Sequence, residues 1–175
     1  MTTKVFYTLD ADGDGKAASR RAMAAAWAAL DIPADAALGK TVLGKPYLKD
    51  WPGVQFNLSH SGGWGVCAVS AAPVGVDVEL VRPLKQDIAK RFFTATEQGY
   101  LAHRPPEEFF RLWTRKESFT KALGKGLTLP MDSFSVLDDV LYRDTTAWFF
   151  HAHPIEGGYL TVCCQQTEAE FQRIQ

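Results

Sequence analysis

The chain has 175 residues, 46% hydrophobic and 22% charged, an ordinary globular composition that can bury the core of one large domain or two small ones. Its 19 lysines and arginines against 20 aspartates and glutamates give no general affinity for nucleic acid or membranes, and the apolar runs are too short to span a bilayer. There is no signal-peptide pattern, and the three cysteines lie in apolar strand-like runs, so we expect reduced core thiols in a cytoplasmic protein.

The first part of the chain predicts a strand, a helix and a hairpin. Alanine-rich sequence favours the helix, Pro46 disfavours regular structure around it, and two apolar runs flank a glycine-containing turn. The predicted elements are a strand over 4–9, a turn over 10–15, a helix over 16–30, an irregular connection over 44–48, and paired strands over 54–59 and 64–70.

The second part predicts another strand, three helices and more strands. Thr94 and Glu97 have the spacing of a capping box, and Pro106 begins a long helix that Gly124 ends. The predicted elements are a strand over 74–80, helices over 88–93, 94–102 and 106–123, and strands over 134–137, 147–153 and 159–164. This order indicates an α+β fold with mainly antiparallel sheets.

A short motif that occurs twice in the sequence indicates two similar halves. Gly62-Gly63-Trp64 and Gly157-Gly158-Tyr159 each precede a strand that contains a Val-Cys pair, and a helix lies upstream of each. We interpret this as two α+β halves, 1–74 and 75–175. A site shared by them is expected at their interface.

Two carboxylates on one strand are the strongest chemical signal. In the strand 74–80, Asp77 and Glu79 point to the same face, where they repel each other. On the long helix Glu117 and Lys121 are four residues apart and share a face with Trp113. Taken singly, these pairs are also typical of a solvated strand edge and a surface ion pair. Together they predict an Mg²⁺ site at Asp77, Glu79 and Glu117 that grips a phosphate group.

Cationic and polar side chains near these carboxylates can contact the phosphate. Lys121, Lys116 and His60 can supply that charge, and His60 lies where a strand ends. A nucleophilic Ser59 or Ser61 with His60 as base is disfavoured, because adjacent residues rarely align for that chemistry.

The turn over 10–15 has the spacing of the front of a calcium-binding loop. Counting Asp10 as the first position, the twelfth is Arg21, where a bidentate glutamate is required. The turn is therefore predicted to cap the following helix rather than to bind calcium.

Five motifs in order resemble the 4′-phosphopantetheinyl transferases of the surfactin-synthetase-activating type. They cover nearly the whole chain from about residue 16. The motifs are Gly44-Lys45-Pro46, Phe56-Asn57-Leu58-Ser59-His60-Ser61, Gly75-Val76-Asp77-Val78-Glu79, Arg91-Phe92-Phe93 with Glu97, and Trp113 with Lys116, Glu117 and Lys121 before Gly124-Lys125-Gly126.

The resemblance implies transfer of phosphopantetheine from coenzyme A to a serine of an apo carrier protein, in a monomer whose pseudo-twofold halves hold coenzyme A between them. Asp77, Glu79 and Glu117 correspond to the metal ligands. Glu117, Lys121, Asp77 and Glu97 correspond to catalytic residues, with the base left open between Glu117 and Glu97. The expected contacts to coenzyme A are Arg20, Gly44, Lys45, Pro46, Ser59, His60, Asp77, Lys116, Glu117 and Lys121. For Glu97 the capping box is a rival explanation.

Carrier docking is expected at Phe92 or Phe93 and over 127–131. One departure from the family pattern concerns the 3′-phosphate of coenzyme A. Members of the family that this chain resembles usually carry a Lys/Arg-rich segment between the first strand and the first helix, where this chain has the acidic turn 10–15. Lys16, Arg20 and Arg21 are then expected to hold more of that phosphate. A non-catalytic coenzyme A binding protein on the same scaffold is the alternative function.

Overall fold

The computed structural model describes residues 2–84 and 88–175, except for the side chain of Leu127. It contains both helices and sheets, as the α+β prediction requires. Its elements are β1 (Thr3–Leu9), α1 (Gly15–Ala28), β2 (Leu38–Lys40), β3 (Pro46–Leu48), β4 (Gln55–Ser61), β5 (Trp64–Ser70), β6 (Gly75–Leu80), α2 (Ile88–Phe92), α3 (Ala95–Leu101), α4 (Glu107–Leu123), the 3₁₀ turns η1 (Gly126–Thr128) and η2 (Met131–Ser133), β7 (Val140–Arg143), β8 (Thr146–Ile155), β9 (Gly158–Cys164) and β10 (Ala169–Arg173).

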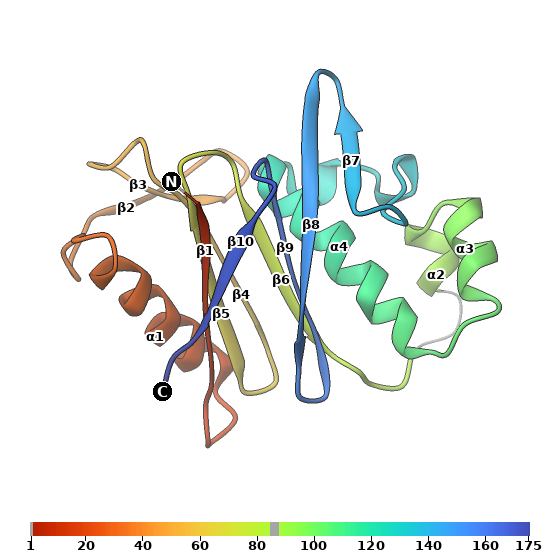
Figure 1. Cartoon of the computed structure of the whole chain (residues 1–175), viewed down its shortest axis with the longest axis horizontal. Helices are drawn as coiled ribbons and strands as arrows, with labels where there is room; N and C mark the ends of the chain where they lie inside the picture. Colours follow the sequence, from red (N-terminus) through yellow and green to blue (C-terminus); the bar gives the residue numbers. More distant parts are fainter. Residues whose placement is uncertain (1, 85–87) are drawn as a thin grey trace.

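Two four-stranded sheets form the centre of the molecule. The first has the strand order β10-β1-β5-β4 and the second β6-β9-β8-β7, while β2 and β3 form a small separate hairpin. Helix α1 covers the outer side of the first sheet and α4 that of the second, so the layers run helix, sheet, sheet, helix (Figure 1). Helices α2 and α3 lie beyond α4 at the far end.

Alternation of side chains along the strands divides the core into three layers. Val5 packs between the two sheets, whereas its neighbour Phe6 packs under α1. In β9, Val162 likewise faces the first sheet and Cys163 faces α4. Because both faces of these strands are covered, buried apolar residues occur at successive positions, as in Val5-Phe6 and Val162-Cys163. All three cysteines are buried, as predicted.

Glycine allows α4 to approach β6 closely. A Cβ on Gly75 would lie 2.0 Å from the carbonyl oxygen of Ser118 and 2.3 Å from the amide nitrogen of Ala122. Gly65 has the same relation to α1, where a Cβ would lie 2.0 Å from the nitrogen of Ser19. Because Gly75 has no side chain, α4, which carries Glu117 and Lys121, can pack directly against β6.

Gly75→Ala is expected to lower the free energy of unfolding by about 3 kcal/mol or more, because α4 must shift away from β6. Chemical denaturation followed by circular dichroism measures this. Gly99→Ala is the matched control: it lies in α3, a Cβ there meets nothing within 4 Å, and alanine favours helix by about 1 kcal/mol. Equal midpoints for Gly75→Ala and the unsubstituted protein would contradict the close-approach argument.

Several predicted elements match the structure within a few residues. The hairpin strands β4 and β5, strand β6, the capped helix α3, the long helix α4 and strands β8 and β9 all occur where expected. In the capping box, Glu97 N donates to Thr94 Oγ1 and Thr94 N donates to the Glu97 carboxylate.

Other predictions are wrong. The segment 134–137 is not a strand, because side chains satisfy its backbone: Val136 N donates to Glu97, and Arg115 donates to the carbonyl oxygens of Val136 and Leu137. Part of the supposed irregular connection 44–48 forms β3. The sequence analysis also missed β2, β7 and β10, of which β10 pairs in parallel with β1.

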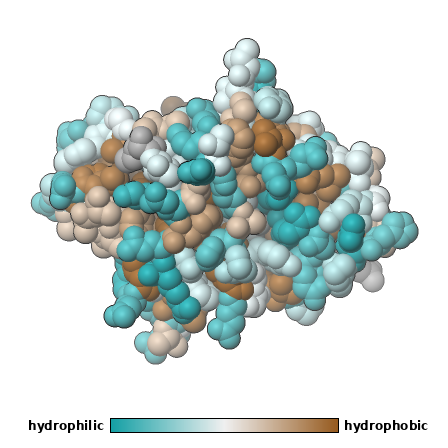
Figure 2. Space-filling model, in the orientation of Figure 1, coloured by the Kyte–Doolittle hydropathy of each residue, from teal (hydrophilic) through white to brown (hydrophobic). Residues whose placement is uncertain are grey.

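The surface seen in Figure 2 carries small, separate apolar patches among hydrophilic side chains. Within 2–84 and 88–175, no helix is long and apolar enough to cross a membrane.

Candidate active site

A polar pocket of about 350 Å³ opens where β4, β6 and α4 meet. It is lined by residues from all three elements. They are Leu58, Ser59, His60, Asp77, Glu79, Trp113, Glu117 and Lys121. Helix α4 places Trp113, Glu117 and Lys121 on one face, as their spacing predicted.

The pocket lies at a junction of two sheet edges. Strands β4 and β6 are each the last strand of their sheet, so the outward N–H groups of β6 have no neighbouring strand to bond. Side chains of β4 accept these hydrogens instead. The three bonds are Val76 N to Asn57 Oδ1 at 3.0 Å, Val78 N to Ser59 Oγ at 3.4 Å, and Leu80 N to Ser61 Oγ at 3.2 Å.

Asp77 is held through one of its two oxygens. Lys121 Nζ donates to Oδ1 at 2.6 Å and Ser59 Oγ donates to the same oxygen at 2.9 Å. Asp77 is only 4% exposed, and among the described residues its Oδ2 is buried without a hydrogen-bond partner. A buried carboxylate oxygen without a donor is costly, and a bound cation would satisfy it.

Glu79 is also fixed through one oxygen. Ser61 Oγ donates to Oε2 at 3.1 Å, and Arg82 Nη1 donates to the same atom at 2.9 Å. Arg82 is largely exposed, so its ion pair with Glu79 contributes little by itself.

The pKa of Glu117 is raised above its ordinary value. Burial raises its pKa first, the charges of Asp77 and Glu79 raise it further, and Lys121 partly offsets them. A cation among these groups would reduce the repulsion. Over the described part of the chain, no group of three or more Asp, Glu, His or Cys side chains is arranged to bind a metal ion. Asp77, Glu79 and Glu117 therefore line one pocket without forming a complete set of metal ligands.

A second pocket of about 210 Å³ adjoins the first through Lys121. Its lining includes the three residues of the predicted nucleotide motif, Gly44, Lys45 and Pro46, together with Asn57. The Lys45 ammonium donates to the carbonyl oxygens of Val74 and Ala122. Burial lowers its pKa to about 8. Lys45 thus ties the β2–β3 hairpin to α4 rather than projecting freely into the pocket.

Lys116 lies outside both pockets. Its side chain is fully buried, and Nζ donates to the carbonyl oxygens of Met131 and Phe134, each at 2.6 Å. It also forms an ion pair with Glu97 at 2.8 Å. The expectation that Lys116 contacts coenzyme A is revised, because its charge is satisfied within the core.

Glu97 is the buried partner of that lysine. Both side chains have 0% exposure, and the Glu97 oxygens also accept from Thr94 N and Val136 N. Glu97 is buried and does not line the pocket. The structure therefore does not place it where a base for the carrier serine would act.

The acidic turn over 10–15 is stabilised by hydrogen bonds and an ion pair of Asp10. Asp10 accepts from the amides of Asp12 and Asp14 and forms an ion pair with Arg21 at 2.8 Å, which lowers the pKa of Asp10. Asp14 caps α1. Arg21 is therefore paired with Asp10, while Arg20 is exposed on α1 and lines neither pocket.

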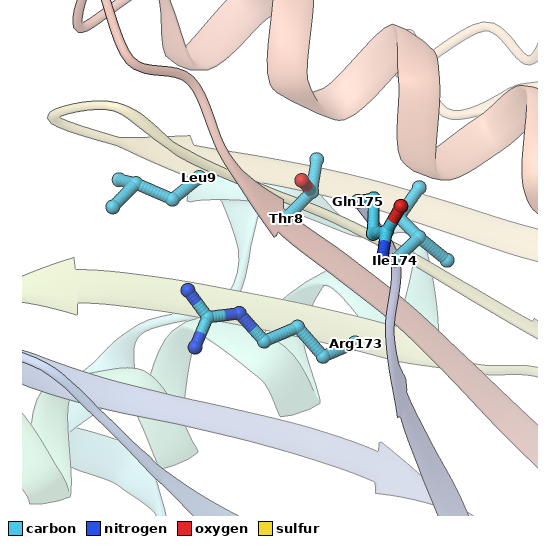
Figure 3. Close-up of a pocket in the computed structure, with 5 residues that line it drawn as sticks. All are labelled: Thr8, Leu9, Arg173, Ile174 and Gln175. Carbon is cyan, nitrogen blue, oxygen red and sulfur yellow. The ribbon is translucent and has the colours of Figure 1, made fainter.

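Another pocket lies away from this chemistry. Figure 3 shows Thr8 and Leu9 at the end of β1 beside Arg173, Ile174 and Gln175, around a volume of about 400 Å³. It has one charged side chain and no carboxylate side chain, so it does not match the predicted site.

The family model of the 4′-phosphopantetheinyl transferase superfamily matches residues 73–164, more than half of the chain and the part that includes Asp77, Glu79, Glu117 and Lys121. The chain belongs to the 4′-phosphopantetheinyl transferase superfamily. The match begins at the strand that carries the two carboxylates and continues through β9.

Curated relatives in this superfamily are similar over part of their length. A 4′-phosphopantetheinyl transferase of Bacillus subtilis is 50% identical over 108 residues, which cover 59% of this chain and 48% of that protein. The Sfp transferase of Bacillus subtilis strain 168 is 50% identical over 97 residues, covering 53% and 43%. The gsp transferase of Aneurinibacillus migulanus is 42% identical over 147 residues, covering 77% and 61%. The chain spans about half the length of the first two.

Sequence reasoning missed the part that Asn57 and Ser61 play in this superfamily member. Both bond to the edge of β6. Asn57 was not a candidate site residue, and Ser61 was considered only as a disfavoured nucleophile. A signal was present: Asn57, Ser59 and Ser61 alternate with period two, so on a strand they share one face.

Proposed function

We propose that the protein transfers the 4′-phosphopantetheine group of coenzyme A to a serine of an apo acyl or peptidyl carrier protein and releases 3′,5′-ADP. The observation that carries this proposal is that one pocket is lined by Asp77, Glu79, Glu117, Lys121 and His60. Three carboxylates with a lysine and a histidine suit a pyrophosphate and its counterion better than an uncharged ligand.

The chain's own residues would orient and neutralise the pyrophosphate. Lys121 lines both pockets, so it can contact the phosphates while the nucleotide end lies by Gly44 and Pro46. Its ammonium would stabilise the charge that grows on the departing 3′,5′-ADP. Ser59 and His60 at the end of β4 would contact the same phosphates.

The residues also fit a divalent cation. Asp77 offers a buried oxygen that has no donor among the described residues, and Glu79 lies close enough for its charge to raise the pKa of Glu117. Bound there with the substrate phosphates, Mg²⁺ would neutralise the charge that develops during transfer. Mg²⁺ is the hard, oxygen-preferring ion that such a donor set favours.

Glu117 is the proposed proton acceptor for the carrier serine. It lines the pocket, whereas Glu97 is enclosed in the core. A general base must lie within reach of the proton that it accepts, and of these two glutamates only Glu117 lines the pocket.

The carrier would dock beside Trp113. Phe92 packs edge-on against Trp113, with ring centroids 5.3 Å apart, and Arg91 lies over Phe92 at 5.1 Å. Phe93 is excluded because it is 1% exposed, and Leu129 and Met131 from the other expected docking segment are buried as well. The side chain of Leu127 lies outside the described residues.

Two similar halves in one chain are part of the proposal. Elements β1, α1, β4 and β5 have the strand order β1-β5-β4, and β6, α4, β8 and β9 have the order β6-β9-β8. This equivalence supports halves 1–74 and 75–175 related by a pseudo-twofold axis, with β10 added to the first sheet. A chain that supplies both halves would act as a monomer.

Release of 3′,5′-ADP tests the function. The protein is mixed with coenzyme A, Mg²⁺ and an apo carrier, and the nucleotide is measured by chromatography. We expect release only when the carrier retains its acceptor serine. Binding of coenzyme A without release, over a panel of carriers, would instead favour a non-catalytic coenzyme A binding protein.

Weak selection for the 3′-phosphate is a further expectation. Arg21 is occupied by Asp10, so Lys16 and Arg20 are the remaining exposed cations at this end of α1. Dephospho-coenzyme A should support transfer with a kcat/KM within about tenfold of coenzyme A, since exposed charge pairs contribute about 1 kcal/mol or less. A loss of several hundredfold with dephospho-coenzyme A would contradict this expectation. Asp10→Asn, which frees Arg21, should increase the preference for coenzyme A.

A further inference from the structure

Ser61 joins the two sheets and also contacts a carboxylate of the site, although it does not line the pocket. Its oxygen accepts from Leu80 N at 3.2 Å, and its hydroxyl hydrogen is directed to Glu79 Oε2 at 3.1 Å. Because a hydroxyl has one hydrogen, the backbone contact leaves that hydrogen for the carboxylate.

Ser59 repeats this arrangement one step earlier on the strand. It accepts from Val78 N and donates to Asp77 Oδ1. Each serine therefore fixes one carboxylate through a single oxygen. The other oxygen of Asp77 is the buried atom that lacks a partner among the described residues.

We propose that Ser61 is a positioning residue that holds Glu79 by Oε2 and so presents its Oε1 to the divalent cation of the site. The inference rests on the proposed function for the nature of the cation. Arg82 contacts the same Oε2 from an exposed position, so Ser61 is the less solvent-exposed of the two supports. Residues that orient metal ligands commonly change metal affinity by about 10- to 100-fold when they are removed.

Asn57 provides a matched control. It accepts from Val76 N at 3.0 Å, as Ser61 accepts from Leu80 N, but within 2–84 and 88–175 no carboxylate hydrogen bond accompanies that contact. Asn57→Ala removes one bond between the sheets, whereas Ser61→Ala removes an equivalent bond together with the support of Glu79. Comparison of the two separates the orientation of Glu79 from the joining of the sheets.

The test is Mn²⁺ binding to the full chain without coenzyme A, with free Mn²⁺ measured by electron paramagnetic resonance. Ser61→Ala should raise the Kd about tenfold, Asn57→Ala should leave it within about twofold, and Ser61→Thr, which keeps the hydroxyl, should restore it. In a Glu79→Gln background Ser61→Ala should have no additional effect. Ser61→Cys replaces Ser61→Ala if circular dichroism shows that the alanine variant is unfolded.

Three outcomes would overturn the inference: an unchanged Kd in Ser61→Ala when Glu79→Gln weakens binding, equal weakening in Asn57→Ala, or no Mn²⁺ binding by the unsubstituted protein. Carrier modification by the same proteins is measured separately. Transfer activity with an unchanged Kd in Ser61→Ala would reject this inference alone, whereas the expected Kd pattern without transfer to any carrier would reject the proposed function alone.

Discussion

Asp77→Asn is expected to lower the rate of carrier modification by at least about a hundredfold while leaving a folded protein. Asparagine keeps the size of the side chain and can still accept from Ser59 and Lys121, which contact Oδ1. It removes the negative charge and replaces one carboxylate oxygen by a donor group, so a cation can no longer bind there with the same strength. Loss of a group that stabilises transition-state charge commonly costs about 100- to 1000-fold in rate.

Initial rates of holo-carrier formation over a series of Mg²⁺ concentrations measure this effect. Asp12→Asn, an exposed aspartate in the turn before α1, is the control for loss of one negative charge and should match the unsubstituted rate. A folded Asp77→Asn protein that works within twofold of the original would show that Asp77 has no part in the chemistry.

Glu97→Ala is expected to reduce the free energy of unfolding by about 3–5 kcal/mol, since it leaves the ammonium of Lys116 buried without its counter-charge. It also removes the acceptor of Val136 N and opens the capping box of α3. Urea denaturation followed by circular dichroism gives the change directly. Glu168→Ala, at an exposed position, should change it by less than about 0.5 kcal/mol.

A double replacement distinguishes this structural role from a catalytic one. Glu97→Gln with Lys116→Met removes both charges and keeps similar volumes, which often costs little stability for a buried pair. We expect this protein to fold and to modify carrier at nearly the original rate. A stable double variant without activity would instead return Glu97 or Lys116 to the site, and Glu97→Gln alone would then tell the two apart.

The sequence predicted local structure well where one signal determined it. The spacing of Trp113, Glu117 and Lys121 gave their shared helix face, and Thr94 with Glu97 gave the cap of α3. These features depend on neighbours three or four residues away, so sequence spacing is sufficient.

Long-range contacts account for what the sequence did not predict. Strand β10 forms because residues 169–173 pair with residues 3–7 at the opposite end of the chain. The direction of Lys116 depends on the carbonyl oxygens of Met131 and Phe134, which face it only in the folded core. The apolar run 134–137 resembled a strand, but its backbone bonds to the side chains of Glu97 and Arg115. Such partners are not visible in local patterns.

The central claim is tested most directly by the mass of an apo carrier protein after incubation with the chain, coenzyme A and Mg²⁺. We predict that the carrier gains the mass of one phosphopantetheine group. The gain should disappear when EDTA is added, when the acceptor serine is replaced by alanine, and when Asp77→Asn is used. An unchanged carrier mass across fatty-acid, polyketide and peptide carriers, with coenzyme A shown to be bound, would contradict the account.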